Sequence, residues 1–138
     1  MAKIINISEA VTIALHSAVI ITKEKGKQVN VNHIADATGS SKFHIAKVLQ
    51  KLVKDGFLGS TRGPSGGFYL AEKPEDITLL QIYESIEGRI VVSKCPLNKP
   101  TCPFGQCVFD DLTMEMTKNF KEYLDSRTLA DYLKNESL

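Results

Sequence analysis

The sequence lacks any run of about 18 apolar residues, so it contains no candidate transmembrane helix. A secretory signal is absent too, because polar Asn6, Ser8 and Glu9 soon interrupt the apolar positions that follow Met1. These two absences argue against an integral membrane protein and against a secreted one. We therefore expect a cytoplasmic protein with no membrane partner.

Cysteine is scarce and odd in number, since the 138 residues contain only Cys95, Cys102 and Cys107. Stable disulfides are rare in the cytosol, so this set favours metal binding or redox chemistry over a disulfide framework. The remaining composition is ordinary, with 43% hydrophobic and 24% charged residues. A chain of this length and composition fits one compact domain.

The chain has almost no excess charge, since its formal net charge is +1. The charges are nevertheless unevenly distributed. Residues 23–63 contain eight Lys or Arg and three Asp or Glu, a balance of +5, whereas residues 108–138 contain four and seven, a balance of −3. The first segment can face phosphates, and the second would be repelled by them. An ordinary solvated surface is the alternative interpretation.

A pair of short helices with a glycine turn is predicted inside the basic segment. Helical spacing predicts the first over 33–38, capped by Asn32, and the second over 42–55. Gly39 supplies the turn between them. The second helix has an apolar stripe made of Ile45, Val48, Leu49 and Leu52. This pattern is typical of a helix-turn-helix, although an ordinary pair of helices can produce it as well.

The face of the second helix opposite its apolar stripe has the chemistry of a DNA-reading surface. Short hydroxyl side chains at a helix start can contact phosphates or base edges, and lysines suit phosphates. The predicted DNA contacts on this face are Ser40, Ser41, Lys42, His44, Lys47 and Lys51.

A short hairpin is predicted directly after the helix pair. Residues 57–61 and 68–70 read as strands, and the glycine-rich string between them allows a tight turn. Arg62 at the rim can enter a minor groove or bind a phosphate. The predicted DNA contacts of this wing are Arg62, Gly63, Pro64 and Ser65.

Further helices flank this region. One is predicted over 9–24 with Ser8 as its N-cap, and another begins after Thr78 and ends at Gly88. Residues 89–106 lack helical periodicity, contain several prolines and read as a loop. A long amphipathic helix near five turns follows, with an apolar stripe made of Phe109, Leu112, Met116, Phe120 and Tyr123. This stripe predicts a dimer interface, or else packing on the chain's own body.

Residues 31–70 resemble the DNA-binding half of the Rrf-type bacterial winged-helix regulators, the family of IscR- and NsrR-like proteins. The strongest match is the string Arg62-Gly63-Pro64-Ser65-Gly66-Gly67-Phe68. The resemblance implies a mostly α fold with a small β-hairpin, in which a winged helix-turn-helix over 1–75 precedes a cysteine-loop sensor and dimerisation region over 76–138. It also implies a homodimer bound to a double-stranded DNA operator.

The cysteine loop is the second site. Thiolates bind iron–sulfur clusters and zinc, and the absence of a CxxC pair disfavours a structural zinc site. Cys107 is predicted at the start of the long helix, where the helix dipole would lower its thiol pKa. The resemblance implies that Cys95, Cys102 and Cys107 hold an iron–sulfur cluster of two or four irons.

A fourth cluster ligand is needed, and several side chains are candidates. The resemblance offers His16, from the first helix of a second protomer, and Asp110, one helical turn past Cys107. These two rank level, with Glu9 behind them. Some relatives of this type lack a cluster and respond through thiols or a protein partner. Accordingly, the predicted function is a redox-sensing, nitric-oxide-sensing or iron–sulfur-sensing repressor, with a cluster-free regulator as the alternative.

Two functions of other classes fit less well. An enzyme would use Cys107 with His16 or His44, but the sequence shows no oxyanion-hole or substrate-pocket signature. A protein-interaction module could use the winged fold without DNA, and it would then lack salt-dependent DNA affinity.

Overall fold

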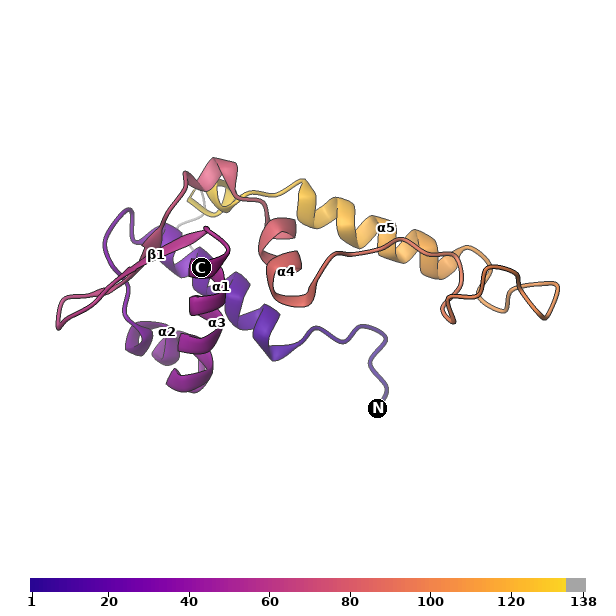
Figure 1. Ribbon diagram of the computed structural model, residues 1–138, viewed down its shortest axis with the longest axis horizontal. Helices are drawn as coiled ribbons and strands as arrows, with labels where there is room; N and C mark the ends of the chain where they lie inside the picture. The colour runs from indigo at the N-terminus through magenta and orange to yellow at the C-terminus, as the bar shows by residue number, and fades with distance from the viewer. Residues whose placement is uncertain (134–138) are drawn as a thin grey trace.

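The computed structural model describes residues 1–133, and it is mainly helical with one two-stranded antiparallel hairpin (Figure 1). The elements in chain order are α1 (Glu9–Lys23), α2 (Val31–Thr38), α3 (Lys42–Lys54), β1 (Leu58–Thr61), β2 (Gly67–Leu70), η1 (Pro74–Asp76), α4 (Leu79–Glu87), α5 (Leu112–Asp125) and η2 (Leu129–Leu133). The predicted fold class is confirmed. None of the helices in this described part combines the length and hydropathy needed to cross a bilayer.

α1 is the centre of one continuous core and packs against α3, α4 and η2. Its start agrees with the sequence prediction, since the Ser8 hydroxyl accepts a hydrogen bond from the Val11 N–H at 3.1 Å. The helix buries side chains on more than one face because other elements cover it on several sides.

The helix-turn-helix is formed by α2 and α3. Gly39 adopts φ +76° between them, as the turn requires. The predicted stripe of α3 is confirmed, since its four members are the buried residues of this helix: Ile45, Val48, Leu49 and Leu52. Ser41 is the N-cap of α3, with its hydroxyl accepting from the His44 N–H at 3.1 Å.

The predicted start of α2 is wrong. Asn30, not Asn32, is the N-cap, and its side chain accepts a hydrogen bond from the His33 N–H at 2.9 Å. The reason lies just upstream, where Val29 exchanges two backbone hydrogen bonds with Phe68, at 2.9 and 2.8 Å. This bridge keeps the chain extended up to residue 30, and the helix begins immediately after it.

The wing consists of β1 and β2, paired with Leu58 opposite Leu70 and Thr61 opposite Gly67. Two glycines allow the close approach of three chain segments. A Cβ on Gly67 would lie 2.5 Å from the Val29 carbonyl oxygen, and one on Gly66 would lie 2.4 Å from the Thr61 carbonyl oxygen. The wing therefore needs glycine at both positions.

The C-terminal half returns to the body of the molecule. Residues 74–76 form a 3₁₀ turn, and α4 begins after Thr78, as the sequence predicted. Thr78 is the N-cap of α4 and forms a capping box with Gln81. The Leu79 N–H donates to the Arg127 carbonyl at 3.0 Å, and Leu129 is completely buried. The end of α5 is thereby fixed against α4 and α1.

α5 is shorter than predicted. It begins at Leu112, because Asp110 adopts a left-handed φ of +54° that ends any helix running from Phe109. Cys107 consequently lies in a turn before α5 and not at its start, so the predicted position of this thiol at the helix start is wrong. Asp110 is likewise not in the first turn of the helix.

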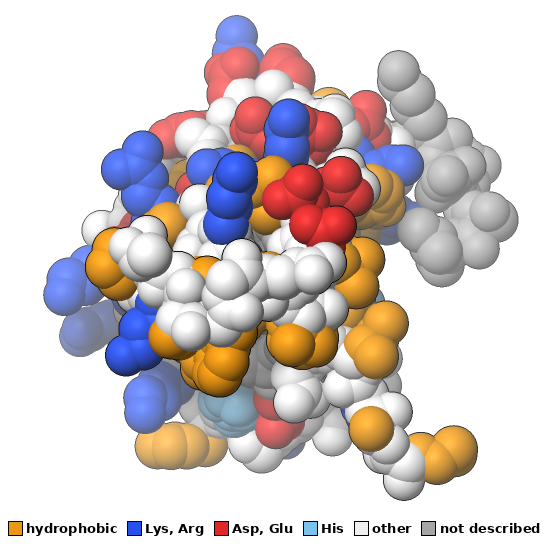
Figure 2. Space-filling view, turned by 90° about the vertical axis from the view of Figure 1, so that its right-hand side faces the viewer, with side chains coloured by type: hydrophobic (Ala, Val, Ile, Leu, Met, Phe, Trp, Pro, Cys, Tyr) orange, Lys and Arg blue, Asp and Glu red, His pale blue; other side chains and the backbone are white. Residues whose placement is uncertain are grey.

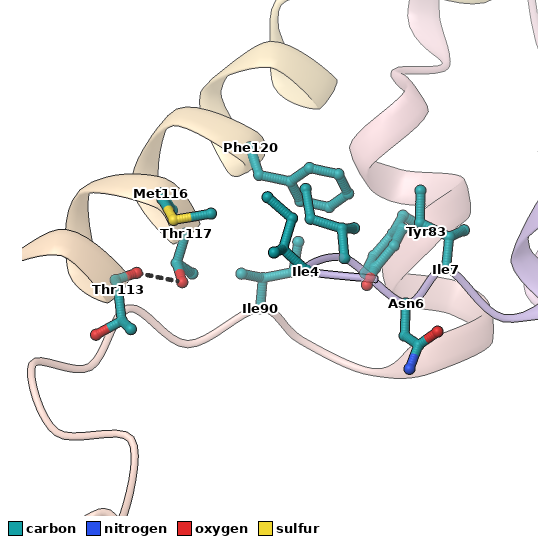
Figure 3. Close-up of a pocket in the computed structure, with 10 residues that line it drawn as sticks. Ile4, Asn6, Ile7, Tyr83, Ile90, Thr113, Met116, Thr117 and Phe120 are labelled. Carbon is teal, nitrogen blue, oxygen red and sulfur yellow. Dashed lines mark hydrogen bonds between the residues drawn. The ribbon is translucent and has the colours of Figure 1, made fainter. Parts of the chain in front are cut away.

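α5 contacts its own chain mainly through its C-terminal part. The Phe120 ring lies 5.5 Å from that of Tyr83 in an edge-to-face arrangement, and Leu124 is buried. Closer to the start of α5, a cavity of about 330 Å³ separates Met116 from Ile90 and from the N-terminal segment around Ile4 (Figure 3).

Candidate DNA-binding surface and cysteine loop

The outward face of α3 holds the lysines that the sequence predicted to contact DNA. Lys42, Lys47 and Lys51 are exposed, whereas the apolar stripe on the opposite face is buried. Ser41 is exposed and Ser40 half-buried beside them at the helix start. α3 is thus held by its apolar side and presents a basic side to the surface, as reading a duplex requires.

His44 is tied to α1. Its Nδ1 atom lies 3.5 Å from a carboxylate oxygen of Glu9, and about a third of the His44 side chain is exposed. His44, a predicted DNA contact, is therefore next to Glu9, the third candidate for the fourth cluster ligand. An acidic group lies at the edge of the basic surface as a result.

Lys51 is also paired, and its partner links α3 to α4. The Asp55 carboxylate accepts hydrogen bonds from Lys51, at 2.9 Å, and from the hydroxyl of Ser85. The Ser85 hydroxyl, followed by the Lys51 ammonium, holds the pKa of Asp55 below its ordinary value. Lys51 is accordingly less free to meet a phosphate than Lys42 or Lys47.

The wing extends away from the helices (Figure 1). Its predicted DNA contacts, Arg62, Gly63, Pro64 and Ser65, are all exposed at the turn. The Gly66 N–H closes this turn on the Gly63 carbonyl at 3.0 Å. A hydrogen-bonded turn of this kind can present Arg62 to a groove or a phosphate.

Sequence reasoning missed the aromatic residue of the α3 surface. Phe43, the second residue of α3, is 81% exposed. The available signal was its position, because an apolar residue two places before Ile45 cannot share the buried stripe of a helix.

The three cysteines lie in the irregular segment between α4 and α5, and all three are free thiols. Each of them opens a similar turn. The carbonyls of Cys95, Cys102 and Cys107 accept from the N–H three residues later, at 3.0, 3.5 and 3.2 Å. Those later residues, Asn98, Gly105 and Asp110, all have positive φ angles.

Backbone N–H groups surround the Cys95 thiol. Backbone N–H groups of Lys99 and then Leu97 lower the pKa of its thiol. A lower thiol pKa makes the thiolate, which is the form that binds a metal, more available at neutral pH. The donor chemistry of the loop thus fits an iron–sulfur cluster.

The isolated chain does not gather a complete ligand set. Within residues 1–133, no three His, Cys, Asp or Glu side chains lie close enough together to hold a metal ion. His16 lies on α1, where its Nδ1 is 2.7 Å from the Thr12 carbonyl, and the cysteine loop lies beyond the far end of α5 (Figure 1). Asp110 closes the Cys107 turn through its backbone.

Comparison with known proteins identifies the family. Residues 7–135 match the family model of Rrf2, described as an iron-dependent transcriptional regulator. The chain belongs to the Rrf2 family. The resemblance stated from the sequence is confirmed by this match.

Several relatives of this Rrf2-family chain are informative. It is 32% identical to protein rrf2 of Nitratidesulfovibrio vulgaris over 111 residues, which is 80% of this chain and 74% of that protein. It is 29% identical to the regulator NsrR of Bacillus subtilis, over 85% of this chain and 82% of that one. Its fold matches the solved structure of CymR, the global cysteine regulator of B. subtilis, with TM-score 0.79 and 26% identity, covering 95% and 98% of the two chains.

Family membership and fold together establish the class of function. This Rrf2-family chain is a DNA-binding transcriptional regulator with a winged helix-turn-helix, and it is not an enzyme.

Proposed function

We propose that this chain is a homodimeric repressor that responds to redox state, nitric oxide or iron–sulfur status through a cluster bound by Cys95, Cys102 and Cys107. The observation that carries the proposal is the loop itself, in which three free thiols each open a similar turn at the free end of α5. The iron-dependent description of the matching family supports the same interpretation.

DNA binding is assigned to α3 and the wing. Lys42 and Lys47 supply phosphate contacts, Ser40 and Ser41 lie at the helix start, and the wing offers Arg62. Each phosphate contact that a variant no longer makes should reduce the slope of log affinity against log salt by about 0.9. Lys42→Ala combined with Lys47→Ala tests this, and an unchanged slope would contradict the assignment. The matched control is Lys73→Ala, outside this surface.

Dimerisation is assigned to α5 and the loop that precedes it. Leu112, Met116 and Tyr123 are exposed on α5, and Val108 and Phe109 just before it are exposed as well. Figure 2, which looks at this end of the molecule, shows hydrophobic side chains on the surface beside Lys and Arg gathered along one side. Several exposed apolar side chains on one segment, such as these, favour an interface with a second subunit.

The oligomeric state tests this assignment. Met116→Glu should convert the dimer to a monomer in light scattering, because it places a charge in an apolar interface. Glu122→Gln, a neutral change on an exposed position of the same helix, is the control. A parent protein that is monomeric at all concentrations would contradict the homodimer.

The fourth ligand is assigned to His16 of the partner subunit or to Asp110. His16 is exposed on α1, and a second protomer is the way to bring an α1 side chain to a loop at the far end of α5. Glu9 is ranked below both, since it already faces His44. When bound, a cluster supplies a redox-labile centre. Cys95, Cys102 and Cys107, once held to the cluster, would order the loop and the start of α5. The DNA affinities of the cluster-bound and cluster-free forms should then differ by about 1–3 kcal/mol in free energy.

The cluster is tested on protein purified without oxygen. The parent protein should be coloured and contain iron, and Cys102→Ala should lose the iron and the signal response while it remains a folded dimer. Thr101→Ala, an exposed position in the same loop, is the control. A colourless, iron-free parent protein would contradict the cluster.

A second candidate is a cluster-free regulator that responds through its thiols or a protein partner. It is favoured by the fold match to CymR, the global cysteine regulator of B. subtilis. In that case the parent protein should be iron-free, and an oxidant should still change its DNA affinity in a manner that Cys102→Ala abolishes.

A further inference from the structure

We propose that Phe43 reads DNA sequence by contacting the C5-methyl group of a thymine in the major groove. This inference rests on the proposed docking of α3 in that groove. It adds a base-reading role to a surface whose lysines position the protein on phosphates.

The position of Phe43 suits direct contact with bases. It is the second residue of α3, after the N-cap Ser41 and the first helical residue Lys42. Residues at the N-terminal end of a recognition helix are the ones that reach base edges. Its aromatic ring is 81% exposed, so the ring is available without any rearrangement of the core.

The surroundings of Phe43 favour DNA over a protein as its partner. Lys42 precedes it, and Lys47 lies one helical turn further along the same face; both are exposed. The lysines of this surface match the phosphates of a DNA backbone, and the ring between them matches an apolar group on a base. In the major groove that apolar group is the thymine methyl, which Phe is known to contact.

The exposed face of α3 carries side chains suited to two kinds of contact, with phosphates and with a base. Phe43, Lys47 and Gln50 follow one another at intervals of four and three residues and are all exposed. Lysine binds phosphates whatever the sequence, whereas the ring of Phe43 gains free energy only where a methyl group is present. Sequence preference and salt dependence should therefore be separable by mutation.

The test replaces thymine by deoxyuracil, which keeps the base pair but removes the methyl group. An operator is first selected from random DNA with the full-length parent protein, under oxygen-free conditions. Each T·A pair of a half-site is then changed to U·A, and the affinity is measured by fluorescence anisotropy at fixed salt. One position per half-site should lose affinity about fourfold, the equivalent of burying one methyl group.

The variant Phe43→Ala should bind the thymine and uracil operators equally, with an unchanged thermal midpoint that shows an intact fold. Lys47→Ala is the matched control, and it should weaken binding to every sequence while it retains the fourfold preference for thymine. The proposal is overturned if the parent protein tolerates uracil at every position, or if the thymine preference survives in Phe43→Ala. If instead Lys42→Ala and Lys47→Ala leave the salt slope unchanged, the docking of α3 itself is wrong.

Discussion

The imidazole of His44 at the start of α3 lies 3.5 Å from the carboxylate of Glu9 at the start of α1. This pair joins the basic surface to the central helix of the core. It also places a negative charge next to the site where phosphates are expected.

Removing that charge should strengthen DNA binding. In Glu9→Gln the acidic group at the edge of the surface is lost and His44 is released, so affinity at low salt should rise about twofold to fivefold, in line with a single charge in a steering field. Glu75→Gln, in η1, should leave affinity unchanged. Iron measured in the same preparation tests the lowest-ranked fourth ligand, since full occupancy in Glu9→Gln would remove Glu9 from the candidates.

The Asp55 carboxylate should stabilise the fold in a pH-dependent manner. Its pKa is lower in the folded state than in the unfolded chain, mainly because of Ser85 and Lys51. The stabilisation is therefore present above the ordinary carboxyl pKa of about 3.9 and is lost as the pH falls through the folded-state pKa. Because the pair is partly exposed, Asp55→Asn should cost about 0.2–1 kcal/mol at pH 7.

Urea unfolding of the parent protein and of Asp55→Asn at pH 7 and at acid pH measures this difference. The two curves should converge in acid. A gap that stays constant with pH would mean that packing, and not the carboxylate charge, accounts for the effect.

The two asparagines near the start of α2 should differ in their contribution to stability. Asn30→Ala removes the hydrogen bond to the His33 N–H and should cost about 0.5–2 kcal/mol in the free energy of unfolding. Asn32→Ala changes an exposed position inside the helix, where alanine is the better helix former, and should cost nothing. Equal losses in both variants would contradict Asn30 as the cap.

The wing should not tolerate a side chain at Gly67. In Gly67→Ala the new Cβ meets the backbone of Val29, so the bridge between Val29 and Phe68 must open. We expect a loss of about 1–3 kcal/mol in stability and weaker DNA binding. Ser65→Ala, at the exposed turn of the same wing, should leave stability unchanged in the same thermal melt.

The parts of the fold that sequence predicts well are those set by local signals. The stripe of α3 follows from apolar spacing alone, and the start of α4 after Thr78 follows from the residue types around it. The start of α2 does not, because the pairing of Val29 with Phe68, 39 positions away in the chain, decides where the extended segment ends. The start of α5 depends on the left-handed backbone of Asp110, which an apolar repeat does not reveal.

The candidate sites show the same division. The lysines of α3 and the residues of the wing can be predicted, because their exposure follows from the elements that carry them. The pairing of His44 with Glu9 and that of Lys51 with Asp55 cannot, since each depends on how side chains meet in three dimensions. The DNA contacts, the ligands and the division of function at residue 75 stay predictions, because DNA, metal and a second protomer are needed to test them.

The attachment of α5 makes it a lever. Its C-terminal end is pinned by buried Leu124 and Leu129 and by the hydrogen bond from Leu79 to Arg127, whereas its other end continues into the cysteine loop. A helix of 14 residues is about 21 Å long, so a pivot of about 10° around the pinned end displaces its tip by about 4 Å. Conversely, a displacement of the cysteine loop by about 4 Å would turn α5 by only about 10° where it joins the body of the molecule.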